Sequence, residues 1–488
     1  MSIVKQEDIM KKKTKIVCTM GPNTDNEETL RKLILAGMDI ARFNFSHGSY
    51  DEQKRRMDMV KKLRKELKIP VAILLDTKGP EIRTGVLKEH KSVNIKDGAE
   101  FTFTTKVIEG DENKVSITYD YLTYELKTGD IILVDDGLMK FEVQKITDTD
   151  IICRTVHGGV LSERKGINLP GISVNLPAIT EKDKEDLLFG IEQDVDFVAA
   201  SFIRSADAVR EIKSFLKDNG GGDIHVISKI ENAQGIEKMD EIIEASDGIM
   251  VARGDMGVEI PAHKVPHIQK EMIRKCRDEF KPVITATQML DSMIRNPGPT
   301  RAEVTDVANA ILDGTDAIML SGETAVGKFP VEAVKMMCEI AVETEQYFDY
   351  EKYASEMESH MKNDISNVVA YSSMHTAKSL KAKFIVTPSI SGFTARIISK
   401  YRPQTPVIGM SPNERTLRRM QIYWGVYPLA STKIENEHAL IERSINILKN
   451  LEYVKKDDTI VITAGVAPSE DMPEVSGNTN TMRVSLIN

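Results

Sequence analysis

The sequence has few cysteines and no long apolar run. Its four cysteines lie far apart and form no CxxC pair, so neither a zinc ribbon nor a redox dithiol is expected. The longest apolar runs, such as residues 71–75, are far too short to span a bilayer. The polar segment 1–15 lacks the apolar stretch of a signal peptide. We therefore expect a cytoplasmic protein with reduced thiols and no membrane partner.

The sequence also has no excess of positive charge and no internal repeat. It carries 65 Lys and Arg residues against 74 Asp and Glu residues, a formal net charge of −9. A net acidic chain has no general attraction for nucleic acid, and we expect no nucleic-acid partner. The length of 488 residues suggests about three domains.

Strands and helices alternate in two parts of the first 350 residues. Strands are predicted at 15–20, 39–45 and 71–76, with helices at 26–36 and 49–67. The alternation resumes at Thr180, which forms a capping-box pattern with Asp183. Five more strands are predicted at 196–202, 225–230, 248–252, 282–287 and 317–320, followed by helices at 206–218, 235–245, 265–279, 300–312 and 330–347. Eight strand–helix units indicate an α/β fold of the (β/α)₈ barrel type, and a doubly wound sheet is the alternative.

Two further blocks interrupt or follow this alternation. Residues 81–177 contain only short alternating runs separated by Gly and Asp turns, which is typical of a small antiparallel β-barrel or sandwich. After a polar segment at 351–363, which we interpret as a linker, five short strands with intervening helices predict a separate doubly wound domain. The expected division is therefore a barrel (1–80 and 178–350), an inserted β domain (81–177) and a C-terminal α/β domain (351–488).

Polar or charged residues follow six of the eight predicted strands, and such positions meet at one face of a barrel. They are the segments 42–47, 76–78, 229–232, 253–255, 287–288 and 321–323. Arg42 and Lys229 are cations suited to a phosphate or a carboxylate. Glu231 and Asp255 are hard oxygen ligands suited to Mg²⁺ or Mn²⁺. This set fits phosphoryl transfer, and it fits equally an enolate chemistry in which a metal and a lysine stabilise a charged oxygen.

Two groups of oxygen-bearing residues have less specific interpretations. Asn44, Ser46, Asp76 and Thr77 together carry too little charge for a divalent ion but enough for a monovalent cation, and they also fit simple caps and turns. The segment 387–394 follows a predicted strand and opens a helix, so its hydroxyls and amides could hold a phosphate or could form an ordinary helix cap.

The same residues carry a resemblance to a known family. The segments 41–48, 76–83, 228–232, 251–260, 286–290 and 319–325 are long, ordered and specific, and the chain resembles pyruvate kinases from end to end. The resemblance implies a (β/α)₈ TIM barrel with an inserted β-barrel lid and a C-terminal doubly wound regulatory domain, usually as a homotetramer. It implies transfer of the phosphoryl group of phosphoenolpyruvate to ADP, giving pyruvate and ATP.

The resemblance also assigns roles to the catalytic residues. Lys229 would stabilise charge on the transferring phosphoryl group and on the enolate, and Arg42 would grip the phosphate. Glu231 and Asp255 would hold Mg²⁺ (or Mn²⁺). The backbone of Gly254 and Asp255 and the hydroxyl of Thr287 would bind the substrate carboxylate, while Thr287 and Ser321 would assist protonation of the enolate.

Further positions match the nucleotide, potassium and effector sites of the family. The nucleotide-contacting positions are Asn44, Phe45, Ser46, His47, Arg83 and Lys165. Asn44, Ser46, Asp76 and Thr77 match the K⁺ site, and Glu81 stands where potassium-independent relatives tend to carry lysine. The effector positions are Ser389, Ser391, Gly392 and Thr394. The facing loop carries Glu470, Asp471 and Glu474, which would repel a second phosphate, so an activator with one phosphate is expected rather than a sugar bisphosphate.

Departures from the family pattern are few. Phe43 replaces the frequent Met, Val326 replaces a frequent Lys, and Asn175 stands where many relatives have Asp. None of them removes a ligand or a catalytic group. The alternatives to a pyruvate kinase are a catalytically inactive protein or another phosphoenolpyruvate-binding barrel with carbon–carbon or mutase chemistry.

Overall fold

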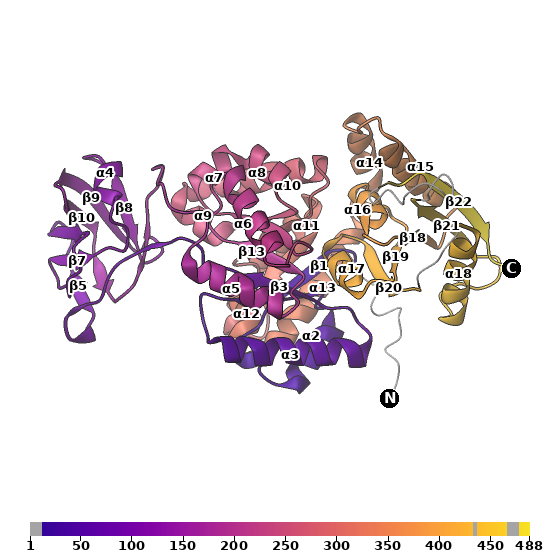
Figure 1. The fold of residues 1–488 in the computed structure, drawn as a ribbon, viewed down its shortest axis with the longest axis horizontal. Coiled ribbons are helices and arrows are strands. Elements are labelled where there is room, and N and C mark those ends of the chain that lie inside the picture. The colour runs from indigo at the N-terminus through magenta and orange to yellow at the C-terminus, as the bar shows by residue number, and fades with distance from the viewer. Residues whose placement is uncertain (1–11, 433–436, 466–477) are drawn as a thin grey trace.

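The computed structural model describes residues 12–432, 437–465 and 478–488. Figure 1 shows three lobes in a row, with the inserted β domain at one end, the barrel in the middle and the C-terminal block at the other end. Among the described residues, no helix is long and apolar enough to cross a membrane.

The middle lobe is a closed barrel of eight parallel strands, as predicted, and not an open doubly wound sheet. In barrel order the strands are β1 (Lys15–Thr19), β17 (Ala317–Leu320), β16 (Val283–Ala286), β15 (Gly248–Ala252), β14 (His225–Ile230), β13 (Phe197–Ala200), β3 (Ala72–Asp76) and β2 (Ile40–Asn44). Their side chains are almost all buried, because neighbours fill the inside of the barrel and helices cover the outside. The larger helices of this ring are α2 (Glu27–Ala36), α3 (Tyr50–Leu67), α5 (Glu181–Glu192), α6 (Ala206–Asp218), α10 (Val265–Asp278), α11 (Arg301–Leu312) and α13 (Pro330–Gln346).

Shorter helices follow three strands of the barrel. They are α7 (Ala233–Glu237) and α8 (Met239–Ala245) after β14, α9 (Arg253–Glu259) after β15, and α12 (Gly322–Ala325) after β17. The single helix predicted at 235–245 is thus two helices that meet at Lys238. The helix α9 was not predicted, because the segment is short and its three charged residues hide the pattern.

Four aspartates bracket the amino ends of alternate barrel strands. Each stands directly before its strand, and its carboxylate accepts the backbone N–H of a residue in the preceding strand at 2.7–2.9 Å. The N–H of each aspartate donates in turn to the C=O of that same residue. We call this set the aspartate ring; its members, with their strand partners, are Asp39 with Ile16, Asp196 with Ile73, Asp247 with Val226 and Asp316 with Val283.

The inserted domain is a small β-barrel, one of the two forms predicted. Seven strands form one sheet in the order β4 (Ile82–Arg83), β12 (Gly166–Asn168), β8 (Ile131–Val134), β9 (Met139–Ile146), β10 (Asp150–His157), β6 (Glu100–Thr104) and β7 (Lys114–Ser116). A bridge between Thr84 and Ile117 joins its two edges and closes it. The pairing of β6 with β7 is parallel, so the sheet is not wholly antiparallel as expected. The remaining elements are α4 (Leu122–Glu125) and the pair β5 (Val93–Ile95) and β11 (Gly159–Leu161).

The C-terminal block is a five-stranded sheet flanked by helices. Its strand order is β20 (Val426–Ala430), β19 (Val407–Ser411), β18 (Phe384–Pro388), β21 (Thr459–Ala464) and β22 (Thr481–Leu486), with only β22 antiparallel. Its helices are α15 (Ile365–Ser379), α16 (Phe393–Lys400), α17 (Glu414–Arg419) and α18 (Glu437–Asn450). The strand order reverses between β18 and β21, the place where open α/β sheets bind ligands.

One prediction for this region is wrong. The polar segment 351–363, interpreted as a linker, lies largely within the helix α14 (Tyr350–Ser359). Asp349 caps this helix by accepting the N–H of Lys352 at 2.9 Å, and Tyr353 and Met357 are buried four residues apart. Two buried side chains are enough to hold a helix whose other residues are polar.

The C-terminal block docks on the aspartate ring. Arg402 donates to Asp316 at 2.7 Å, and Arg418 donates to Asp196 at 2.6 Å; both arginines are buried. The other two ring members pair within the barrel lobe, Asp39 with Lys12 and Asp247 with Lys213. The opposite end of the barrel, where the strands end, is therefore left to the inserted domain and the site described next.

Candidate functional site

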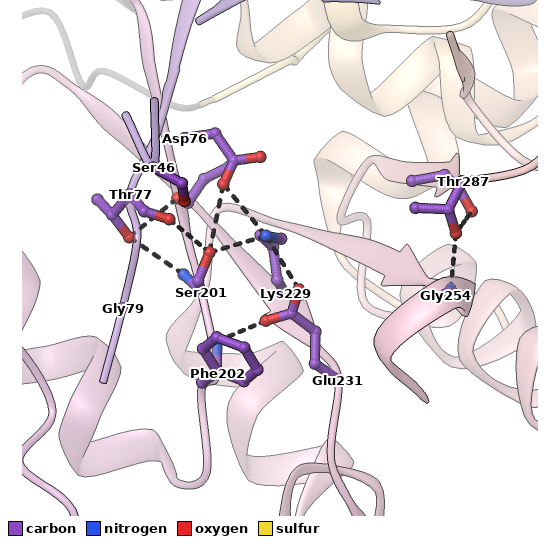
Figure 2. Close-up of polar contacts among 12 residues, drawn as sticks. Ser46, Asp76, Thr77, Gly79, Ser201, Phe202, Lys229, Glu231, Gly254 and Thr287 are labelled. Atoms are coloured by element: carbon purple, nitrogen blue, oxygen red, sulfur yellow. Dashed lines mark hydrogen bonds and ion pairs between the residues drawn. The ribbon is translucent and has the colours of Figure 1, made fainter. Parts of the chain in front are cut away.

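Lys229 lies at the centre of a buried polar cluster at the carboxyl end of the barrel (Figure 2). Its Nζ is 2.7 Å from Ser201 Oγ, 3.1 Å from Asp76 Oδ1 and 2.9 Å from Glu231 Oε1. Burial alone would lower the pKa of Lys229, but Asp76 and Glu231 outweigh it and hold the pKa above its ordinary value. The ammonium group is therefore charged at neutral pH.

Asp76 is shared between the two cations of the predicted site. Its Oδ2 accepts from Arg42 Nε at 2.6 Å while its Oδ1 faces Lys229. Burial would raise the pKa of Asp76, yet Arg42 and Lys229 together keep it below the usual value. Arg42 also donates to Thr19 Oγ1 at 2.8 Å, so its guanidinium is held in one orientation.

Glu231 and Asp255 are carboxyl groups whose charged forms are disfavoured by burial. Burial, together with the charge of Asp255, raises the pKa of Glu231 to about 7 against the opposing charge of Lys229. Burial raises the pKa of Asp255 as well. Although Glu231 Oε1 lies close to Lys229, its alignment leaves this buried oxygen without a hydrogen bond.

A divalent ion fits this pair of carboxylates. It would relieve the repulsion between them and coordinate Glu231 Oε1, the oxygen that pairs with Lys229. Within the described ranges, no group of three or more His, Cys, Asp or Glu side chains could hold a metal.

The sequence reasoning missed Ser201 and Phe202. The strand was predicted to reach residue 202, but β13 ends at Ala200 and the next two residues form a turn. Ser201 Oγ contacts both Lys229 and Asp76, and the Phe202 N–H donates to Glu231 Oε2 at 2.6 Å. Phe202 has a φ of 56°, so the backbone turns sharply to direct this N–H at the carboxylate. A strand boundary two residues earlier would have exposed both residues as site candidates.

Thr287 and Gly254 form a second group across the same face (Figure 2). The Gly254 N–H, predicted to bind a substrate carboxylate, donates to Thr287 Oγ1 at 2.7 Å. Thr287 and Gln288 have φ values of 68° and 55°, an uncommon conformation that is strained for a β-branched residue. Arg253 holds this turn by donating to the Ala286 and Thr287 carbonyls at 3.1 and 2.6 Å.

Ser321 follows β17 and is fixed by its neighbour. Glu323 accepts the Ser321 N–H at 2.7 Å and the Leu290 N–H at 3.1 Å, so one buried carboxylate joins the loops after β16 and β17. Burial raises the pKa of Glu323. The sequence placed Glu323 in the ring of strand ends without giving it this role.

The four residues of the predicted monovalent-cation site lie at the ends of two adjacent strands. Asn44 of β2 is in register with Asp76 of β3, and Ser46 and Thr77 follow these strands (Figure 2). Asn44 Oδ1 accepts the Ser46 N–H at 3.0 Å, and Thr77 Oγ1 accepts the Ser201 N–H at 3.2 Å. Both readings of this group, a cation site and local caps, therefore remain compatible with its geometry.

The predicted nucleotide residues fall into two places. Arg83 and Lys165 lie side by side on the inserted domain, where Arg83 pairs with Glu81 and Lys165 pairs with Asp135 at 2.9 Å. His47 is exposed after β2. Phe45 is instead buried, packed against Tyr50 and Phe189.

The predicted effector loop lies at the reversal point of the C-terminal sheet. Ser389 Oγ accepts the Gly392 N–H at 3.0 Å, and Ser391 Oγ accepts the Phe393 N–H at 3.4 Å. Thr394 is buried and bonds to Thr479 at 2.9 Å. The acidic residues Glu470, Asp471 and Glu474 lie outside the described residues.

Comparisons with known proteins agree over the whole chain. A family model described as "Pyruvate kinase, barrel domain" matches residues 11–334, and one described as "Pyruvate kinase, alpha/beta domain" matches residues 367–485. A pyruvate kinase of Clostridium acetobutylicum is 48% identical over 476 residues, which is 97% of this chain and 99% of that protein. One of Geobacillus stearothermophilus is 47% identical over 480 residues, 98% of this chain and 81% of that protein.

A solved structure gives the same result. The crystal structure of a pyruvate kinase from Cryptosporidium parvum has a TM-score of 0.93 and 37% sequence identity, and the match covers 99% of this chain and 97% of that one. The similarity therefore extends over the barrel, the inserted domain and the C-terminal block together.

Proposed function

The chain belongs to the pyruvate kinase family, and from this premise we propose that it transfers the phosphoryl group of phosphoenolpyruvate to ADP, giving pyruvate and ATP. The observation that carries the proposal is the buried cluster of Lys229 with Asp76, Ser201 and Glu231. It joins a fixed cation to a carboxylate pair at the end of the barrel where such enzymes bind their substrates.

The two cations act on the phosphoryl group. Arg42, oriented by Asp76 and Thr19, grips the phosphate of phosphoenolpyruvate. Lys229 stays charged and stabilises negative charge as it develops on the transferring group and on the enolate oxygen. Because phosphoryl transfer is chiefly a matter of positioning and charge, no nucleophilic side chain is required.

Glu231 and Asp255 would hold Mg²⁺ (or Mn²⁺). Bound there, the ion would supply positive charge that polarises the substrate oxygens. Lys229 lies beside the same carboxylates, so this chain places its own ammonium and the metal ligands on one side of the reacting group.

The residues around Thr287 bind the substrate carboxylate and assist protonation of the enolate. The amides of Gly254 and Asp255 and the Thr287 hydroxyl bind the carboxylate, and the existing bond from Gly254 N–H to Thr287 Oγ1 is exchanged for one to the substrate. Thr287 and Ser321 deliver a proton, through water, to the methylene carbon of the enolate once the phosphoryl group has left.

The nucleotide binds between the barrel and the inserted domain, which acts as a lid. Arg83 and Lys165 contact its phosphates from the lid side, and the segment from Asn44 through Ser46 to His47 contacts it from the barrel. The lid comprises residues 81–177, the barrel 1–80 and 178–350, and the regulatory domain 351–488.

A potassium ion would complete the charge of the site. Asn44, Ser46, Asp76 and Thr77 offer it an amide, two hydroxyls and a carboxylate. Glu81 pairs with Arg83 rather than bringing a cation of its own, so no lysine takes the place of K⁺ at this position.

Activity is regulated through the C-terminal domain by an activator that bears one phosphate. The Ser389 and Ser391 hydroxyls, Gly392, Thr394 and the first amides of α16 bind the phosphate. The enzyme works in the cytoplasm as a homotetramer, without nucleic-acid or membrane partners. The exposed edge strand β22, with the partly exposed apolar side chains of Met482, Val484 and Leu486, supports contact between copies of this chain.

One coupled assay tests these proposals. Pyruvate formation should require both phosphoenolpyruvate and ADP, should disappear when Mg²⁺ is chelated, and should be much slower in Na⁺ than in K⁺. Sugar or nucleotide monophosphates should lower the KM for phosphoenolpyruvate more than fructose 1,6-bisphosphate does. A purified protein that binds phosphoenolpyruvate but forms no pyruvate would favour an inactive or a different barrel.

A further inference from the structure

The short helix α9 contacts the active site at one end and the lid at the other. Its first turn carries Gly254 and Asp255 of the proposed site, and its last residue is Glu259. Asn168, the last residue of the lid strand β12, donates its side-chain amide to Glu259 Oε1 at 2.9 Å. The lid is therefore bonded to the helix that carries a proposed metal ligand.

A second lid group converges on the same carboxylate. The pKa of Glu259 is raised by burial, and the Asn168 amide and the Leu169 backbone N–H oppose this rise because both donate to the charged form. The tip of the lid hairpin between β8 and β9 also approaches α9, where a methyl group added at Gly137 would lie 3.6 Å from Val258 Cγ1. Two places on the lid, the end of β12 and the hairpin tip, thus meet the last turn of α9.

Arg204 connects this contact to the catalytic cluster. Burial lowers the pKa of Arg204, and the charges of Glu259 and Glu231 act against that shift. Arg204 also donates to the carbonyl of Phe202, whose N–H is bonded to Glu231. The side chains of Asn168, Arg204, Asp255 and Glu259 line one cleft between the barrel and the lid.

We propose that Glu259 is a positioning residue that fixes the lid over the catalytic face by accepting hydrogen bonds from Asn168 and Leu169. This inference rests on the proposed function, since it concerns closure of the lid on the nucleotide. In the described part of the chain, no hydrogen bond or ion pair joins Glu259 directly to the Lys229 cluster or to Thr287, so it acts through α9, Arg204 and the lid rather than on the reacting atoms.

The hydrogen bond between Asn168 and Glu259 lowers the free energy that nucleotide binding must supply to close the lid. Without the Asn168 bond, ADP binding must itself supply the free energy that holds the lid down. In Asn168→Ala we expect the KM for ADP to rise about 10- to 100-fold, the size of one hydrogen bond to a charged group, while kcat stays within about twofold. Glu259→Gln should shift the KM in the same direction.

Two measurements test the proposal. In the full chain with Cys338 replaced by serine, spin labels at Lys145→Cys on the lid and Lys217→Cys on α6 report the distance between lid and barrel without substrate. Asn168→Ala should broaden that distance distribution and shift it to longer distances. The double variant Asn168→Ala with Glu259→Gln should have a KM for ADP less than about twofold above that of Glu259→Gln alone. Asn94→Ala, the same change at an exposed site of the lid, should alter neither quantity.

An unchanged distance distribution and an unchanged KM in Asn168→Ala would overturn the proposal, and so would fully additive effects of the two substitutions. Because the distance is measured without turnover, an unmodified enzyme that formed no pyruvate would refute the proposed function alone.

Discussion

At the scale of single residues, the site depends on one carboxylate shared by two cations. Asp76 holds Arg42 on one oxygen and Lys229 on the other. Neither cation is free to move to the other's position, so the two can act at different points of the substrate.

Replacement of Lys229 by methionine should therefore slow turnover strongly, while Arg42 still pairs with Asp76. We expect kcat to fall about 100- to 1,000-fold, the size of a lost electrostatic contact in the transition state, while the KM for phosphoenolpyruvate changes little because Arg42 still grips the phosphate. Steady-state kinetics of Lys229→Met measure kcat and KM, and its thermal midpoint measures its stability. Lys238→Met, at an exposed position, is the control, and a raised KM with normal kcat would make Lys229 a binding residue only.

Much of this residue-level organisation could be predicted from the sequence, because residues at barrel strand ends must meet. Lys229, Asp76 and Glu231 were all identified in that way. Ser201 was not, since the apolar run to Phe202 hid the true end of β13. The left-handed turn at Thr287 was also beyond prediction, because it depends on Arg253, which comes from a different strand end.

At the scale of elements, α16 runs from the proposed effector loop to the barrel. Its last residue, Lys400, is buried with its Nζ 3.1 Å from the centre of the Phe280 ring, and no hydrogen-bond acceptor for it lies in the described ranges. Burial lowers the pKa of Lys400 to about 7, against the charges of Asp278 and Glu279. The charged form of Lys400 is thus disfavoured at the contact between this helix and the barrel.

This strain gives a stability difference that depends on pH. The folded pKa lies below the unfolded value of 10.5, so the free energy of unfolding should decrease as the pH falls from about 10 to 7 and should be independent of this group below that. Lys400→Met lacks the titration and should be more stable by about 1–3 kcal/mol at pH 7, with the gain vanishing near pH 10. Urea denaturation at several pH values measures this gain, with the exposed Lys456→Met as control. An equal gain at all pH values would contradict the argument.

The element boundaries show which physical signals the sequence carries. Barrel strands such as β14 and β15 were predicted to the residue, because both faces are buried and the apolar run is continuous. A β-barrel was one of the two forms predicted for the lid, but the residues that close it, Thr84 and Ile117, could not be predicted, since isolated pairings of distant residues leave no periodic pattern. The helix α14 was missed because only two of its side chains are buried.

At the scale of the whole molecule, the aspartate ring decides how the C-terminal block sits on the barrel. Asp316 and Asp196 each meet a buried arginine of that block, whereas Asp247 meets Lys213, whose side chain is 34% exposed. Asp316 and Asp196 thus join two domains, whereas Asp247 does not, and its stability effect can serve as the control for theirs.

Neutralising a member that joins domains should cost more than neutralising the solvated one. Asp316→Asn leaves the buried Arg402 without its counter-ion, and we expect a loss of about 3–5 kcal/mol in the apparent free energy of unfolding. Asp247→Asn should lower the apparent free energy of unfolding by about 1 kcal/mol or less, because water can solvate the partly exposed Lys213 that loses its ion pair. Thermal and urea denaturation of the two variants give the comparison, and equal losses would show that the bracket alone, and not the arginine, sets the cost.

Assembly should depend on the edge of the C-terminal sheet. Val484 and Leu486 are 43% and 59% exposed on β22, two residues apart and so on one face. Paired Val484→Glu and Leu486→Glu substitutions should lower the molar mass in light scattering from that of four chains. Val160→Glu, on an exposed strand of the lid, should leave the mass unchanged. A tetramer that survives the paired substitution would place the interface elsewhere.

The pairing of β1 with β17 has a consequence for how the chain acquires its structure during synthesis. Lys15 is in register with Ala317, so the first strand must wait for most of the chain before the barrel can close. The lid closes between Thr84 and Ile117 and through the pairing of β4 with β12, all within one intervening stretch. Local pairings form faster than distant ones. The lid is therefore expected to emerge from the ribosome as a finished unit while the barrel around it is still an open sheet with two unpaired edges, the stage at which the nascent chain is most exposed to aggregation and most in need of a chaperone.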